Sequence, residues 1–270
     1  MATRHPHRGA PSLLHSALEW RALGEMALLP AALPLLATAP RGDGHPVLLL
    51  PGFMGGERSL IGLERFLRWR GYAVQTWGLG RNVGFHARHA KALAQKLRHL
   101  HHQSGRKVSL VGWSLGGLFA LAAAQQAPEC VRSVVTLGSP VSIDPMANAS
   151  PLWIRALYRL VAHPLGPAAH AMQPSARRLR ALEGLSAPLS CLYSISDGVV
   201  PPQEATVEGD PARRENIRVP GSHVGLGFNA AVLWIVAERL AQPQGQWRPF
   251  APSGPLGAAY RALTHAALPV

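Results

Sequence analysis

The chain has 270 residues, of which 47% are hydrophobic and 15% are charged. This composition is typical of a globular protein and excludes an intrinsically disordered chain, and the length suits one large domain. Lysine and arginine number 27 against 14 for aspartate and glutamate, which gives a formal net charge of +13. Because the arginines are scattered and form no dense basic run, we interpret this charge as a solvated surface and expect no specific nucleic-acid partner.

Residues 1–44 are expected to form an N-terminal arm. Within it, residues 12–40 have the pattern of an amphipathic segment, interrupted by two prolines, that packs on the following domain. Contact of this arm with a membrane surface is the alternative interpretation. The most apolar part, residues 26–37, is much shorter than the roughly 20 residues that a membrane-spanning helix needs.

The arm does not have the pattern of a signal peptide, because three charged residues precede its most apolar part: Glu19, Arg21 and Glu25. The chain has two cysteines, Cys130 and Cys191, whose positions do not indicate a disulfide. We therefore expect a cytoplasmic protein, with association at the membrane surface as the alternative. The sequence leaves the oligomeric state open.

Short apolar runs alternate with helix-like segments through residues 45–242, the expected main domain. This alternation predicts an α/β fold, with a mostly parallel twisted sheet and helices on both faces. Residues 140–186 break the rhythm and predict a small helical cap, and residues 243–270 predict a surface tail that ends in a short helix. The expected strands are residues 46–50, 72–77, 108–113, 131–137, 188–195 and 217–219, and the expected helices are residues 58–70, 84–103, 115–126 and 228–240.

Several histidines lie in the expected helix at 84–103. Two pairs have a spacing of three residues that suits a shared metal ion, namely His86 with His89 and His99 with His102. No carboxylate or cysteine near them completes a site. We therefore expect a solvated helix face and no metal site.

The most informative motif is Gly112-Trp113-Ser114-Leu115-Gly116, a G-x-S-x-G sequence between an expected strand and an expected helix. A nucleophilic serine must project from a very tight strand-to-helix turn, whose strained backbone leaves no room for side chains two residues before and after it. Glycine at both positions meets this requirement. The helix that follows directs its N-terminal N–H groups at the reacting carbonyl. The motif therefore predicts Ser114 as a catalytic nucleophile.

A nucleophilic serine needs a general base, and the base needs an acid that orients it, in the chain order serine, acid, histidine. Asp197 follows one expected strand and His223 lies in a glycine-rich loop after the next, so both fall with Ser114 at the carboxyl edge of the sheet. We expect His223 to take the serine proton and Asp197 to orient the imidazole. Asp144 and Glu204 are the alternative acids, and a simple turn is the alternative role for Asp197.

Backbone N–H groups from two loops are expected to form an oxyanion hole. One donor is Leu115, directly after the nucleophile. The second comes from the glycine-containing loop after the first strand, where we favour Phe53 and keep Met54 as the alternative. The residues expected to line a substrate pocket are Met54, Trp113 and Trp153, and packing is the alternative role for the two tryptophans.

The Pro-Gly-Phe loop at 51–53, the Ser114 turn, Asp197 and His223 together resemble the α/β-hydrolase superfamily, and within it the bacterial lipases and carboxylesterases. The resemblance runs from about residue 45 to 240. Similar lipases usually have His-Gly at the start of the first loop, where this chain has Pro-Gly. The resemblance implies ester hydrolysis without a metal or an organic cofactor.

We therefore expect a serine hydrolase, either an esterase or a lipase, that cleaves a small-molecule acyl ester or a lipid through an acyl-enzyme intermediate. An acyltransferase or amidase that uses the same three residues is the first alternative. A non-catalytic protein of the same fold that binds lipid or a partner is the second. Esterase and lipase activity differ in whether an apolar cap opens at an interface, and the sequence does not identify the substrate.

Overall fold

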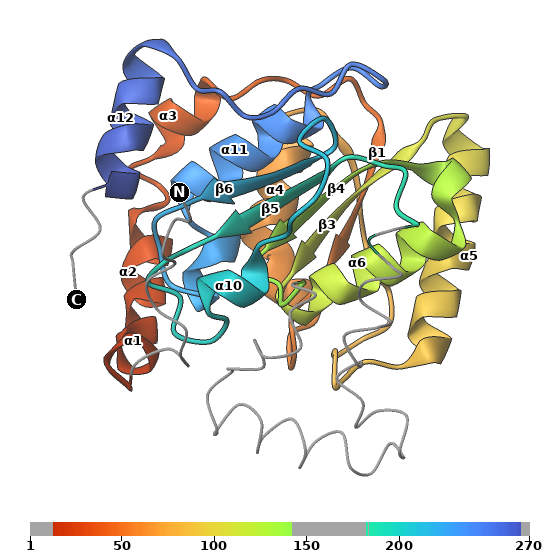
Figure 1. Ribbon diagram of the computed structural model, residues 1–270, viewed down its shortest axis with the longest axis horizontal. Coiled ribbons are helices and arrows are strands. Elements are labelled where there is room, and N and C mark those ends of the chain that lie inside the picture. Colours follow the sequence, from red (N-terminus) through yellow and green to blue (C-terminus); the bar gives the residue numbers. More distant parts are fainter. Residues whose placement is uncertain (1–12, 142–181, 183, 266–270) are drawn as a thin grey trace.

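Within the part of the chain that the structure describes, six short runs of residues form the strands of one parallel sheet (Figure 1). The computed structural model describes residues 13–141, 182 and 184–265, so the predicted cap at 140–186 lies almost wholly outside the described residues. The strands are β1 (Pro46–Leu50), β2 (Ala73–Thr76), β3 (Val108–Trp113), β4 (Val131–Leu137), β5 (Leu189–Tyr193) and β6 (Arg214–Arg218). They follow the order β2–β1–β3–β4–β5–β6, and each neighbouring pair is parallel.

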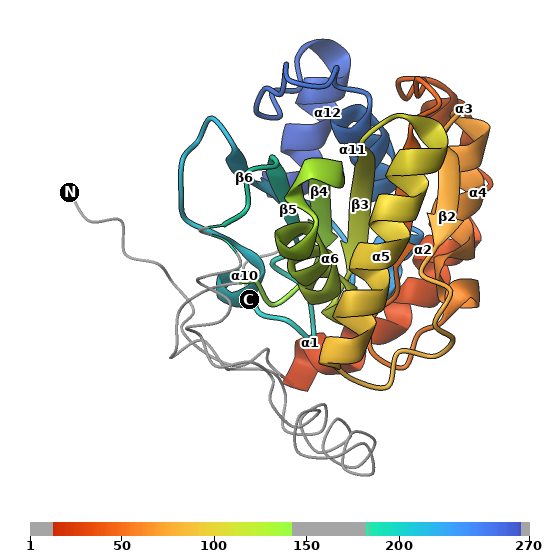
Figure 2. The same cartoon turned by 90° about the vertical axis from the view of Figure 1, so that its right-hand side faces the viewer.

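Helices cover both faces of this sheet, as predicted. The main covering helices are α4 (Ile61–Trp69), α5 (Ala87–Ser104), α6 (Leu115–Gln126) and α11 (Ala230–Leu240). Helices α5 and α6 lie side by side on one face (Figure 2). Successive strand residues point to opposite faces, so β1 contributes to two separate cores. Leu48 and Leu50 pack with α5 and α6, whereas Val47 and Leu49 pack with α4 and α11.

The last strand is where prediction and structure differ most clearly. The sequence predicted a strand at 217–219, but β6 begins at Arg214 and pairs with β5 from Leu189↔Arg214 to Tyr193↔Arg218. This strand lies at the edge of the sheet and begins with charged residues, which is common for edge strands and leaves no apolar run to mark its start.

The prediction of a solvated histidine face was wrong for the N-terminal end of α5. His86 is buried, and the ring of His89 lies 6.1 Å from the ring of Phe119 on the neighbouring helix α6. At the other end of α5, His99 and His102 are exposed. The first turn of α5 thus packs on an aromatic side chain of α6, whereas its last turn exposes histidines to solvent.

The N-terminal arm packs on the domain at the carboxyl ends of the last strands (Figure 1). Its elements are α1 (Leu13–Ala17), η1 (Leu18–Trp20), α2 (Arg21–Leu28) and α3 (Leu33–Ala37). Helix α2 packs on the short helix η5 (Val224–Gly227), and α3 packs on α11. Seven large apolar side chains of the arm, here together called the apolar arm surface, are exposed: Leu18, Trp20, Leu23, Met26, Leu28, Leu33 and Leu35.

No helix within the described ranges combines the length and the hydrophobicity that crossing a lipid bilayer requires.

The C-terminal segment returns to the edge of the sheet and ends in α12 (Gly254–His265). The hydroxyl of Tyr260 donates to the carbonyl oxygen of Arg218 over 2.8 Å, and the backbone N–H of Phe250 donates to the carboxylate of Glu215. These contacts attach the segment to β6.

Candidate active site

Ser114 occupies a strained turn between β3 and α6. Its backbone φ is 53° and its ψ is −124°, a left-handed conformation that non-glycine residues rarely adopt. A Cβ atom on Gly112 would lie 2.5 Å from the Cα of Gly117, and one on Gly116 would lie 2.2 Å from the carbonyl oxygen of Leu50. The two glycines of the motif are therefore required by close backbone contacts, as the sequence indicated.

A chain of hydrogen bonds joins Ser114 to the two residues predicted as its partners. His223 Nε2 lies 3.0 Å from Ser114 Oγ, and His223 Nδ1 lies 2.7 Å from Asp197 Oδ2. Because a carboxylate only accepts, Nδ1 carries the proton, and Nε2 accepts from the serine hydroxyl. This arrangement can deprotonate the serine as it attacks an electrophilic carbon.

Backbone N–H groups of its own loop fix the carboxylate of Asp197 in place. Its Oδ1 accepts from the backbone N–H groups of Val199 and Val200, at 2.8 and 2.7 Å, and the side chain is almost fully buried. Gly138 follows β4, and a Cβ atom there would lie 2.9 Å from Asp197 Oδ2 and 3.1 Å from His223 Nδ1. The structure therefore places Asp197, of the predicted acids, beside the histidine. The alternative acid Glu204 lies on α10 (Pro202–Ala205), and the other alternative, Asp144, lies outside the described residues.

The electrostatic surroundings favour a charged imidazole at His223. Burial alone would lower the pKa of this histidine, but the charge and hydrogen bond of Asp197 and the charge of Glu19 outweigh it. The pKa of His223 is therefore raised above its ordinary value of 6.5. A base whose protonated form is stabilised suits proton transfer during nucleophilic attack.

The loop after β1 passes directly over Ser114. A Cβ atom on Gly52 would lie 3.1 Å from Ser114 Cβ, so a larger residue would fit only if the loop or Ser114 shifted slightly. Leu115 is the first residue of α6, and the N–H groups of a first helical turn have no acceptor within the helix. The backbone N–H of Met54 donates to the carbonyl oxygen of Asn82 over 2.7 Å. That bond occupies the N–H of Met54, the alternative donor. The assignment of Phe53 as the second oxyanion donor stays a prediction.

Trp113 supports the backbone of the His223 loop. Its indole Nε1 donates to the carbonyl oxygen of His223 over 3.1 Å, and its ring packs in the core that contains α4 and α11. Met54 is 37% exposed on the loop above Ser114, and its role in a substrate pocket stays a prediction. Trp153 lies outside the described residues.

Asn82 is a site residue that sequence reasoning missed. Its side-chain amide donates to the carbonyl oxygen of Pro51, and its backbone N–H donates to that of Gly55, at 2.8 and 2.7 Å. With the bond from Met54, three contacts fix the loop that carries Phe53. A single asparagine between glycines carries no signal in the sequence that distinguishes it from an ordinary turn residue.

Glu19 and Glu25 of the arm were also missed. Glu19 accepts hydrogen bonds from the backbone of the His223 loop, and Glu25 accepts one from the N–H of Ser222 over 2.8 Å. Nothing in the arm sequence indicated a partner about 200 positions away.

A second Asp–His–Ser chain lies elsewhere in the sheet. His45 Nδ1 lies 2.5 Å from Asp43 Oδ1, and its Nε2 lies 2.9 Å from Ser109 Oγ near the start of β3. His45 and Ser109 are fully buried, and burial lowers the pKa of His45 to about 4. Because no substrate reaches a buried serine on a regular strand, this chain stabilises the fold, and Ser114 is the candidate nucleophile.

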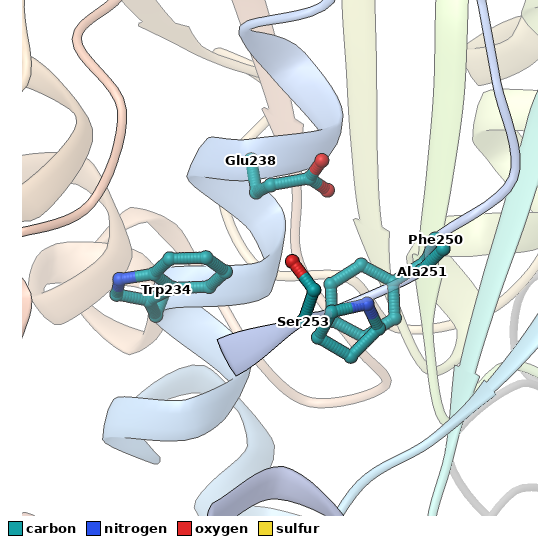
Figure 3. Close-up of a pocket in the computed structure, with 6 residues that line it drawn as sticks. Trp234, Glu238, Phe250, Ala251 and Ser253 are labelled. Carbon is teal, nitrogen blue, oxygen red and sulfur yellow. The ribbon is translucent and has the colours of Figure 1, made fainter. Parts of the chain in front are cut away.

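A surface hollow of about 260 Å³ lies between α11 and the C-terminal segment (Figure 3). It is lined by Trp234, Glu238, Phe250, Ala251, Pro252 and Ser253. None of these belongs to the Ser114 chain. Within the described part of the chain, no three histidine, cysteine or acidic side chains are grouped closely enough to hold a metal ion.

Residues 45–190 match the model of a protein family described as the alpha/beta hydrolase fold. The match includes β1, the Ser114 turn and the start of β5. The chain belongs to the α/β-hydrolase family. This assignment confirms the fold class that the sequence predicted.

Two curated proteins resemble part of this chain. A pimeloyl-[acyl-carrier protein] methyl ester esterase of Citrobacter koseri is 33% identical over 117 residues, 43% of each chain. The human serine hydrolase BPHL is 33% identical over 111 residues, 36% of this chain and 37% of its own. The matches thus span less than half the length of these relatives.

Solved structures share the fold at low sequence identity. Aspergillus fumigatus lipase B is 17% identical with a TM-score of 0.55, and the match covers 78% of this chain and 56% of the lipase. Bacillus licheniformis lipase BlEst2 in its mature form is 16% identical with a TM-score of 0.55, and the match covers 76% of this chain and 95% of the lipase.

Proposed function

We propose that this hydrolase cleaves carboxylic esters through an acyl-enzyme intermediate on Ser114. The observation that carries the proposal is the hydrogen-bond chain from Ser114 through His223 to Asp197, built on a turn with a positive φ. The partial relatives, one named as a methyl ester esterase and one as a serine hydrolase, support the same class of reaction. The proposal defines the substrate class by its ester bond and not by the rest of the molecule.

In the first half-reaction, Ser114 Oγ attacks the ester carbonyl carbon while His223 Nε2 takes the hydroxyl proton. Asp197 stabilises the imidazolium, and the N–H groups of Leu115 and Phe53 bind the oxyanion. Breakage of the carbon–oxygen bond releases the alcohol, which leaves with the proton from His223. In the second half-reaction, water gives a proton to His223 and attacks the acyl carbon, which releases the acid and returns the proton to Ser114.

Hydrolysis of p-nitrophenyl esters with acyl chains of about two to sixteen carbons tests the proposal. We expect turnover by the wild type and a loss of at least about 10⁴-fold in kcat for Ser114→Ala. The preferred chain length then separates esterase from lipase behaviour. Wild-type activity in Ser114→Ala would contradict the assignment of the nucleophile.

Ser109→Ala is the matched control, since Ser109 also bonds a histidine that bonds an aspartate. We expect this variant to retain kcat and to lose stability by about 1 kcal/mol from the broken buried bond. Equal losses of activity in both variants would point to general unfolding.

The alternative activities are separated by the product. A transferase forms a new ester when a primary alcohol competes with water, and an amidase releases p-nitroaniline from anilides. Binding of lipid without turnover of any acyl compound would favour the non-catalytic alternative.

We further propose that the apolar arm surface contacts an anionic lipid surface. Trp20 is 78% exposed there, and Val224, which adjoins His223, is 43% exposed. Large apolar patches on a protein surface mark interaction sites, and the arm exposes seven large apolar side chains between Leu18 and Leu35. The formal net charge of +13 favours an anionic surface over a neutral one.

A further inference from the structure

One carboxylate of the arm bonds both loops that carry the histidine and the aspartate. Glu19 Oε1 accepts from the backbone N–H groups of Gly198 and His223, at 2.8 and 2.9 Å, and Oε2 accepts from that of Val224 at 2.8 Å. Gly198 follows Asp197 directly. Two loops that follow different strands are thus joined by a single side chain.

Two other arm residues bond the loop that carries Asp197. Ser16 Oγ donates to the carbonyl oxygen of Gly198 over 2.8 Å, and Arg21 Nη2 donates to that of Ser196 over 2.9 Å. A Cβ atom on Gly198 would lie 2.4 Å from the carbonyl oxygen of His15, so the arm and this loop are in close backbone contact. The arm therefore has a built docking site at these loops, and Glu19 makes its central contacts.

The hydrogen bonds of Glu19 hold the two loops whose side chains, Asp197 and His223, must stay aligned with Ser114. Hydrogen bonds from backbone N–H groups to a carboxylate are charge-assisted and stronger than neutral ones. Displacement of the His223 loop by a fraction of an ångström would lengthen the contact between His223 Nε2 and Ser114 Oγ. Positional errors of that size at reacting groups lower the rate markedly.

We propose that Glu19 is a positioning residue of the active site, which aligns the His223 and Asp197 loops and stabilises the imidazolium formed when Ser114 is deprotonated. The role in deprotonation rests on the proposed function. The alignment of the two loops does not, because it follows from the three bonds to backbone N–H groups.

The charges around His223 support this role. Asp197 faces the ring at Nδ1, and Glu19 faces the backbone of the same residue. Both carboxylates raise the pKa of His223, against the opposing effect of burial. Of the other charged arm residues here, Arg21 bonds the carbonyl oxygen of Ser196, and Glu25 bonds the Ser222 N–H and the Asn229 side chain.

Glu19→Gln tests the proposal, with Glu25→Gln as the matched control. Both variants remove one arm carboxylate that accepts a backbone N–H bond near His223, but only Glu19 bonds His223 itself. Three readouts are compared: hydrogen exchange of the Gly198, His223 and Val224 amides, the NMR titration of the His223 ring, and kcat with KM on an ester. The ring resonance is assigned by its absence in His223→Gln.

For Glu19→Gln, we expect amide exchange at least about tenfold faster than in the control, because a charge-assisted bond to each amide is lost. The titration midpoint of His223 falls in Glu19→Gln and stays near the wild-type value in Glu25→Gln. The value of kcat falls about tenfold with KM nearly unchanged. A purely structural role would lower the melting temperature of both variants and leave the midpoint in place.

Equal exchange rates and equal midpoints in the two variants would overturn the proposal. Exchange and titration need no turnover, so they test Glu19 even if the wild type hydrolyses no ester, an outcome that would contradict only the proposed function. If Glu19→Gln is isolated only in an unfolded form, Glu19→Asp against Glu25→Asp carries the same comparison. We then expect the amides of Gly198 and His223 to exchange faster in Glu19→Asp than in Glu25→Asp, because the shortened side chain no longer reaches them. Equal exchange rates in these two variants would overturn the proposal.

Discussion

The backbone N–H of Met54 donates to the carbonyl oxygen of Asn82 over 2.7 Å, so the loop above the nucleophile is fixed from a neighbouring segment of the chain. The same asparagine donates from its side chain to the carbonyl oxygen of Pro51. We expect Asn82→Ala to lower kcat by up to about 10²-fold with a smaller change in KM, because the loss of the side-chain bond to Pro51 removes one of the three contacts that hold the loop carrying the proposed oxyanion donor Phe53. Steady-state kinetics on a p-nitrophenyl ester measure both constants.

Asn216→Ala is the control for this prediction. Asn216 also makes two bonds to backbone groups, both to Val207, at 2.9 and 2.7 Å. Its replacement is expected to lower the melting temperature and to retain kcat. A similar loss of kcat in both variants would contradict a specific role for Asn82.

The raised pKa of His223 predicts the pH dependence of catalysis. His223 acts as a base only when neutral, so kcat/KM is expected to rise with pH and to reach half its maximum above pH 6.5. Asp197→Asn removes a carboxylate that raises this pKa and should move the midpoint to lower pH. A wild-type midpoint below 6.5 would contradict the prediction.

The same shift has a consequence for stability. A histidine with a raised folded pKa stabilises the fold fully below its unfolded pKa, and that contribution is lost as the pH rises through the folded pKa. The window for His223 therefore begins at about pH 6.5 and extends upward. Denaturant unfolding across this window should show the loss in the wild type but not in His223→Gln.

His45 predicts the opposite behaviour in a different window. Burial lowers its pKa from 6.5 to about 4, and the charges of Arg132 and Arg106 add to this effect against Asp43. The folded state therefore resists protonation, and stability is lost as the pH falls from 6.5 to 4, by on the order of 3 kcal/mol. Denaturant unfolding of the wild type and His45→Gln over this range measures the loss, which should be absent in the variant.

Sedimentation with lipid vesicles tests the apolar arm surface. The wild type is expected to bind vesicles that contain anionic lipid and to bind neutral vesicles less well. Trp20→Gln should reduce binding several-fold, because an exposed indole is lost from the surface. Trp69→Gln is the control, since Trp69 is 50% exposed on α4 and not on the arm. Equal binding by the two variants would count against this surface.

The sequence predicts the central part of the fold well, because buried parallel strands are continuous apolar runs and each ends in a turn signal. It also predicts Ser114, since the glycines around it are demanded by close backbone contacts at the turn. The start of β6 was missed because charged residues at an edge strand give no apolar signal.

The supporting residues of the site could not be predicted from the sequence. Asn82, Glu19 and Glu25 act through backbone atoms of distant loops, and any loop offers N–H and carbonyl groups regardless of its side chains. The packing of His89 on Phe119 likewise depends on a partner in another helix. Such contacts follow from the assembled fold and leave no local pattern.

The bond between Glu19 and the His223 N–H joins residues 204 positions apart. Contacts of such separation form late in folding, since closing a long loop costs entropy before the contact compensates for it. The strands can pair and the helices can pack before the arm reaches its loops. During refolding, recovery of esterase turnover is therefore expected to lag behind recovery of the helix and sheet signal in circular dichroism.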